Sequence, residues 1–150
     1  MLSYETLEEE TAESVKNLNS ISTQIKQKES RLNEISELQK QISNYSRTLD
    51  VYRSYRDSGW DKKYYWANEG AIILHRAAKK YFDRLGMKKL PPMQSLKQEY
   101  ASLCSEKNKL YTRLKPAREK IIKLKTAKQN VEMILGEPRQ YSKSHGRDAR

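Results

Sequence analysis

Residues 93–135 read MQSLKQEYASLCSEKNKLYTRLKPAREKIIKLKTAKQNVEMIL, and this stretch decides the fold. A largely apolar stripe runs through it in steps that alternate between three and four residues: Leu96, Tyr100, Leu103, Lys107, Leu110, Leu114, Ala117, Ile121, Leu124, Lys128, Val131 and Leu135. This is the spacing of a heptad repeat, in which one narrow face of a helix is apolar. The stretch therefore predicts a long helix that packs against another helix along this seam.

A glycine and three prolines mark the ends of this helix. Pro91 and Pro92 stand before the stripe, where a missing backbone N–H costs little. Gly136 occupies the position of a C-terminal glycine cap, and Pro138 should prevent the helix from continuing. We therefore expect a helix over residues 92–135.

A second stripe occupies residues 4–56, a segment without glycine or proline. Its apolar positions are Tyr4, Leu7, Leu18, Ile21, Ile25, Leu32, Ile35, Leu38, Ile42, Tyr45, Leu49 and Tyr52. The steps again are three and four, with Thr11, Ser14 and Lys28 as weak places in the stripe and two consecutive steps of three from Leu32 to Leu38. Neither helix can bury its stripe alone, and a single segment connects the two. The simplest solution is an antiparallel, coiled-coil-like hairpin in which residues 46–56 lie near residues 93–103. The alternative is a parallel homodimer formed through one stripe.

The segment between the two long helices should form a helical tip. Asp61 is suited to cap a short helix over residues 61–85, and Gly86 is suited to end it. Nine of the chain's 13 aromatic residues fall between Tyr45 and Phe82, which predicts a compact aromatic cluster at the tip.

The composition agrees with this all-α organisation. Apolar residues make up 36% of the chain and charged residues 33%, too few apolar residues for one broad core. We expect a single helical domain over residues 1–138. Residues 139–150 have no periodicity and are predicted to form a disordered basic tail.

Positive charge is concentrated in the later part of the chain. The net charge of +11 divides into −3 over residues 1–46 and +14 over residues 47–150. Such an excess favours a polyanionic partner, most simply DNA bound without sequence preference, either single-stranded or double-stranded. A solubilising charged face is an equal alternative. The candidate nucleic-acid-binding residues are Arg47, Arg53, Arg56, Lys62, Lys63, Arg76, Lys79, Lys80, Arg84, Lys88 and Lys89.

The sequence offers no catalytic, metal-binding or cofactor-binding motif. His75 and His145 are its only histidines and stand far apart, so we expect His75 to be a packing or surface residue. Cys104 is the only cysteine, so no disulfide can form within the chain. No apolar run is long enough to span a membrane. These features predict a non-enzymatic, cytoplasmic protein without cofactor.

The middle of the chain resembles a known family. Residues 55–100, YRDSGWDKKYYWANEGAIILHRAAKKYFDRLGMKKLPPMQSLKQEY, followed by NVEMILG at residues 130–136, resemble the C-terminal helical region of relaxase/mobilization nucleases of Gram-positive conjugative plasmids and integrative elements. In that family a separate N-terminal domain nicks DNA with a tyrosine and a histidine-bound metal. The histidine cluster is absent here, so the resemblance transfers no catalytic residue to this chain.

The resemblance implies a non-catalytic accessory domain of a DNA-mobilisation relaxase. Such a domain would hold DNA near the nick site, or dock to the relaxase catalytic domain or other conjugation proteins. The alternatives are a protein-interaction scaffold without a role in DNA binding and a coiled-coil module that forms a homodimer.

Overall fold

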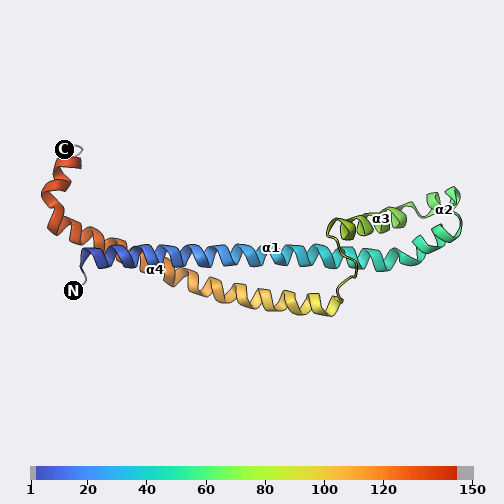
Figure 1. Cartoon of the computed structure of the whole chain (residues 1–150), viewed down its shortest axis with the longest axis horizontal. Helices are drawn as coiled ribbons and strands as arrows, with labels where there is room; N and C mark the ends of the chain where they lie inside the picture. Colours follow the sequence, from blue (N-terminus) through green and yellow to red (C-terminus); the bar gives the residue numbers. More distant parts are fainter. Residues whose placement is uncertain (1–2, 145–150) are drawn as a thin grey trace. The chain divides into compact units, whose positions relative to one another are not determined.

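Every regular element in the structure is helical. The computed structural model describes residues 3–144, and the side chains of residues 3–135. The elements are α1 (Tyr4–Asp57), α2 (Lys62–Ala67), α3 (Glu69–Arg84) and α4 (Met93–Ser144) (Figure 1). The prediction of an all-α fold built on two long helices is confirmed.

The chain divides into two compact units. Met1–Lys28 and Glu106–Arg150 form one, here called the terminal unit, and residues 29–105 form the other, here called the central unit. Helices α1 and α4 each contribute one segment to each unit. Helices α2 and α3 belong entirely to the central unit.

In the terminal unit, α1 and α4 run antiparallel along the predicted seam. Its buried cluster consists of Ile21, Ile25, Leu110 and Ala117, with Leu18 and Leu114 packed against it. Two contacts fix the direction of the pair: the Tyr4 hydroxyl donates to Glu132, and Lys28 Nζ lies 2.8 Å from Glu106 Oε1. The N-terminal residue of α1 therefore meets the later part of α4, as an antiparallel hairpin requires.

In the central unit, α3 covers much of the α1 face that was expected to meet α4. The buried cluster here joins three helices: Ile35, Leu38 and Ile42 of α1, Ala78 and Phe82 of α3, and Leu96 of α4. The later part of α1 lies beside α3 (Figure 1). There the Thr48 hydroxyl of α1 lies within hydrogen-bond distance of His75 of α3.

The predicted pairing of residues 46–56 with residues 93–103 is therefore wrong. Leu96 packs with Ile35 and Leu38 instead. The physical reason is that the connecting segment has an apolar face of its own. This face is buried by packing against the C-terminal part of α1.

Two turns of the same type end α1 and α3. After α1, the N–H of Gly59 donates to the carbonyl of Arg56 and that of Trp60 to the carbonyl of Tyr55. Gly86 and Met87 repeat this pattern after α3. Both glycines have the positive φ that this motif requires, +76° at Gly59 and +68° at Gly86.

The expected short helix consists of two helices. Asp61 caps α2 as predicted, because its side chain accepts a hydrogen bond from the Tyr64 N–H. At Asn68, which separates α2 from α3, the backbone leaves helical geometry with φ −131° and ψ 27°. Gly86 ends the second of them, as expected.

Helix α4 is longer than the sequence predicted. Its backbone stays helical through Gly136 and Pro138 to Ser144, so the expected end near residue 135 is wrong. Glycine costs about 1 kcal/mol within a helix relative to alanine, and proline about 3 kcal/mol because it removes one hydrogen bond and crowds the previous turn. Both residues disfavour a helix without forbidding it. The predicted disordered tail is thus helical over residues 139–144, and residues 145–150 lie outside the described residues.

Within residues 3–144, no helix combines the length and the apolar character that crossing a bilayer requires.

Candidate nucleic-acid interface

All eleven basic candidates belong to the central unit and are exposed to solvent. They comprise Arg47, Arg53 and Arg56 of α1, Lys62 and Lys63 of α2, Arg76, Lys79, Lys80 and Arg84 of α3, and Lys88 and Lys89 of the loop before α4. We call these eleven residues the basic surface. Residues 47–89 hold only five acidic side chains beside them.

Helix α3 separates its basic side from its packing side. Its buried residues are Ile72, His75, Ala78 and Phe82, which follow one face of the helix. Arg76, Lys80 and Arg84 follow one another at intervals of four residues, so they form a stripe with steps of about 6 Å along the axis. All three are exposed. The packing of α3 thus leaves this row of cations facing solvent.

Few of these cations are neutralised within the chain. Among the described residues, Arg56 is the only member of the basic surface in an ion pair, with Asp57 at 3.3 Å. Arg47 donates to the side-chain oxygen of Asn44. The remaining positive charge is available to an external anion.

Arg76 is held in place by aromatic side chains. Its guanidinium lies 5.6 Å from the ring centroid of Tyr55 and 6.0 Å from that of Tyr65. Hydrogen bonding to the Tyr52 hydroxyl, and to a lesser extent to that of Tyr55, raises the pKa of Arg76. These contacts orient Arg76 without pairing it with a carboxylate among the described residues.

The interior beneath the basic surface is aromatic and centred on His75. The imidazole is 2% exposed and stacks between Tyr45, at 4.5 Å between ring centroids, and Tyr52, at 4.4 Å. Its Nδ1 lies 3.0 Å from the Thr48 hydroxyl, which itself donates to the carbonyl of Asn44. Since that hydroxyl proton is already used, His75 Nδ1 is best assigned as the donor to Thr48. His75 is a packing residue, as expected.

Two tryptophans that were predicted to belong to the compact aromatic cluster are exposed to solvent. Trp66 is 70% exposed and Trp60 48% exposed. Trp60 still packs edge-on against Tyr55, with ring centroids 5.2 Å apart, but it has a left-handed φ of 62°, which is unusual for a bulky residue. Trp66 makes an edge-on contact with its neighbour Tyr65 at 5.3 Å. The sequence pattern did not separate these exposed indoles from the buried rings.

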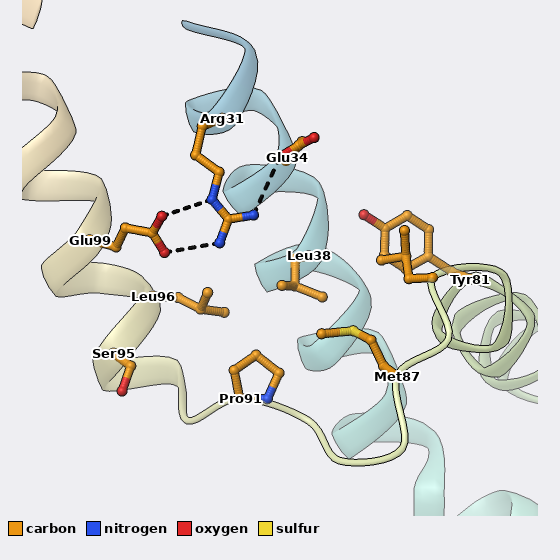
Figure 2. Close-up of a pocket in the computed structure, with 10 residues that line it drawn as sticks. Arg31, Glu34, Leu38, Tyr81, Met87, Pro91, Ser95, Leu96 and Glu99 are labelled. Atoms are coloured by element: carbon orange, nitrogen blue, oxygen red, sulfur yellow. Dashed lines mark hydrogen bonds and ion pairs between the residues drawn. The ribbon is translucent and has the colours of Figure 1, made fainter. Parts of the chain in front are cut away.

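A second feature of the central unit is a hollow of about 450 Å³ between α1, α3, α4 and the segment that joins α3 to α4. Figure 2 shows its apolar wall, to which Leu38, Met87, Pro91 and Leu96 contribute. Its volume falls within the range of small-ligand and side-chain pockets. No motif in the sequence pointed to it, because its walls come from four separate segments of the chain.

A fixed ion pair borders this hollow (Figure 2). Arg31 binds Glu99 through two parallel hydrogen bonds of 2.8 and 3.0 Å and reaches Glu34 at 3.3 Å. The bond to Glu99 raises the pKa of Arg31 and lowers the pKa of Glu99. Burial, and secondarily the charges of Glu37 and Glu34, raises the pKa of Tyr81, which also lines the hollow. The rim therefore carries excess negative charge, unlike the basic surface.

No group of His, Cys, Asp and Glu side chains suited to hold a metal ion occurs in the described part of the chain. Cys104 is half-buried on α4. No set of side chains in the described part of the chain suggests a cofactor site.

Comparisons with known proteins identify no relative. No protein family matches the chain, and neither a curated protein nor a solved structure is similar to it. The resemblance to relaxases thus stays a prediction from the quoted residues.

Proposed function

We propose that this chain is a non-catalytic helical accessory domain that binds DNA without sequence preference through the basic surface. The proposal is supported chiefly by one observation: eleven exposed cations gather on the central unit, and among the described residues only Arg56 is paired with a carboxylate. Phosphate contacts of this kind need charge and exposure but no enclosed pocket.

The setting that we propose is a DNA-mobilisation relaxase. There the domain would hold DNA near the nick site or dock to the transfer machinery. This part of the proposal rests on the resemblance of residues 55–100 and 130–136 alone. A second contact region would be the later basic run of α4, from Lys107 to Lys128.

A salt titration of DNA binding tests the proposal. Contacts to phosphates release counterions, so affinity should fall steeply as salt rises. With about six phosphates neutralised, the loss between about 50 and 200 mM salt should be on the order of a thousandfold. Replacing Lys62, Lys63, Lys79 and Lys80 together by Gln should flatten the salt dependence by roughly one unit for each lost contact.

A matched set of four exposed lysines outside the basic surface serves as the control. Lys16, Lys26, Lys40 and Lys97 are exposed and, replaced together by Gln, remove the same charge. This control should keep most of the affinity and the original salt slope. If both sets weaken binding equally, the basic surface is not the contact region. If no DNA binds even at low salt, the basic surface serves solubility.

The hollow beside Arg31 supports a second candidate function, a protein-interaction scaffold. Its apolar wall and acidic rim suit a partner that presents an apolar side chain next to a basic one. Leu85, the residue that follows α3, lines this hollow and is 54% exposed, whereas Leu74 of α3 is 44% exposed and does not line it.

A pair of variants tests the scaffold function. Leu85→Glu should abolish binding to a purified relaxase catalytic domain, measured by calorimetry, and Leu74→Glu should not. Equal binding by both variants would show that the hollow is not the contact site for this partner. Light scattering on the same samples tests the homodimer alternative.

A further inference from the structure

Trp66 has an exposure that the packing of the central unit does not explain. Its side chain is 70% exposed on α2, a helix without any buried residue. Tyr55, by contrast, is 8% exposed and packs against Trp60, Tyr64 and Tyr65. An indole left in water gains nothing from hydrophobic burial. Trp66 is thus a large apolar ring that the fold itself does not use.

The surroundings of Trp66 are basic. Lys62 and Lys63 precede it by four and three residues on the same helix, so all three side chains share one side of α2. Both lysines are exposed and have no ion-pair partner within the described part of the chain. Any partner that covers the indole must therefore accept two cations beside it.

The indole makes a ring contact with its neighbour in the sequence. Trp66 meets Tyr65 edge-on, with ring centroids 5.3 Å apart and planes at 83°. Tyr65 is in turn fixed against Tyr55, at 5.7 Å between centroids, and by the guanidinium of Arg76. The exposed indole therefore lies beside a ring that is packed into the central unit.

We infer that Trp66 is a stacking platform for an unpaired nucleobase, with Lys62 and Lys63 binding the adjoining phosphates. A flat aromatic ring next to phosphate-binding cations is the arrangement by which proteins hold single strands without reading their sequence. In a duplex the bases are stacked on one another and leave no free face for the indole. The chain should therefore prefer single-stranded over double-stranded nucleic acid. This inference rests on the proposed binding of nucleic acid by the basic surface and names its strand preference.

The test compares three labelled probes of equal length by fluorescence anisotropy on the full chain. They are oligo(dT), an abasic strand with the same phosphates, and a DNA duplex. Trp66→Ala should weaken binding to oligo(dT) by roughly tenfold. Binding to the abasic strand and the duplex should stay within about twofold, and the salt slope should not change, because no charge is lost. Trp66→Phe should restore part of the lost affinity.

Two further variants sharpen the comparison. Ile73→Ala removes another exposed apolar side chain, 50% exposed on α3, and should leave all three affinities unchanged. Trp60→Phe leaves Trp66 as the only tryptophan, and its fluorescence should be quenched by oligo(dT) but not by the abasic strand. Circular dichroism checks that each variant keeps its helical content.

The outcomes separate this inference from the function on which it rests. If oligo(dT) and duplex bind, and Trp66→Ala changes neither affinity, the stacking inference is overturned while DNA binding stands. If Ile73→Ala weakens oligo(dT) binding as much as Trp66→Ala does, the contact is generally apolar and not stacking. If no probe binds at low salt, the proposed function fails, and the inference fails with it.

Discussion

Protonation of His75 should weaken the central unit. The imidazole is 2% exposed between the rings of Tyr45 and Tyr52, with Nδ1 3.0 Å from the Thr48 hydroxyl. Burial lowers the pKa of His75, the carbonyl of Tyr45 opposes this effect, and the charge of Lys79 adds to it. The folded unit therefore favours the neutral ring.

The direction of the pH dependence follows from this shift. In the unfolded chain a histidine has a pKa of about 6.5. Between that value and the lower pKa of the folded state, the unfolded state binds more protons, so the free energy of unfolding falls as pH falls. The stabilisation is complete above about pH 6.5. Between about pH 7.5 and about pH 5.5 the loss should reach at most about 1.4 kcal/mol, the free energy of one proton over one pH unit.

Urea unfolding followed by tryptophan fluorescence measures this effect within the central unit. Both tryptophans, Trp60 and Trp66, lie there, and Trp60 contacts Tyr52 and Tyr55. His75→Phe keeps a flat ring between the tyrosines but does not titrate. Its stability should depend less on pH than that of the wild type over this range. If both proteins lose the same free energy, the titration of carboxylates explains the effect and the reasoning about His75 is refuted.

The other predictions concern the seam and catalysis. Leu110 is 5% exposed in the terminal unit, so Leu110→Ala should lower the free energy of unfolding in urea by roughly 2–5 kcal/mol. Lys123 is exposed, so Lys123→Ala should change it by no more than about 0.5 kcal/mol. Equal unfolding midpoints for the two variants would show that the seam is misassigned. The purified chain should not nick DNA with Mg²⁺ or Mn²⁺, because its sequence has no histidine cluster to hold the metal. Reproducible nicking that a Tyr→Phe change abolishes would overturn this prediction.

Periodicity predicted which faces of the long helices are buried, even at positions of mixed character. Thr11 and Ser14 interrupt the apolar stripe of α1, yet they are buried at 8% and 7% exposure. The Thr11 hydroxyl satisfies itself by donating to the carbonyl of Leu7. The position in the heptad therefore decided burial, and a local hydrogen bond made the polar side chain acceptable there.

Periodicity did not predict which helix each face meets. The stripe of α1 continues without a break from Ile35 to Tyr52, but Ile35 packs with Leu96 of α4 and Tyr52 stacks on His75 of α3. An apolar stripe specifies that a partner exists and leaves its identity open. The choice depends on the length of α3 and the turn at Gly86, which together determine where α4 begins.

The charged residues of the candidate interface could be predicted from the sequence, but the exposure of its aromatic rings could not. Lysines and arginines are exposed almost wherever they occur, so the eleven basic residues could be identified from the sequence alone. Aromatic residues occur both in the cores and on the surfaces of proteins. Trp66 and Tyr65 are neighbours in sequence, and only the course of α2 distinguishes the exposed ring from the partly buried one.

The distribution of charge has a physical consequence for the proposed polyanionic partner. Solubility is served as well by mixed charges, and residues 1–46 carry such a mixture, with five basic and eight acidic side chains. Residues 47–89 instead hold eleven basic and five acidic side chains. Like charges within about a Debye length of 8–10 Å repel one another and oppose folding of the unit that carries them. A bound strand of phosphates would relieve this repulsion. Solubility alone gives no reason to concentrate positive charge in residues 47–89.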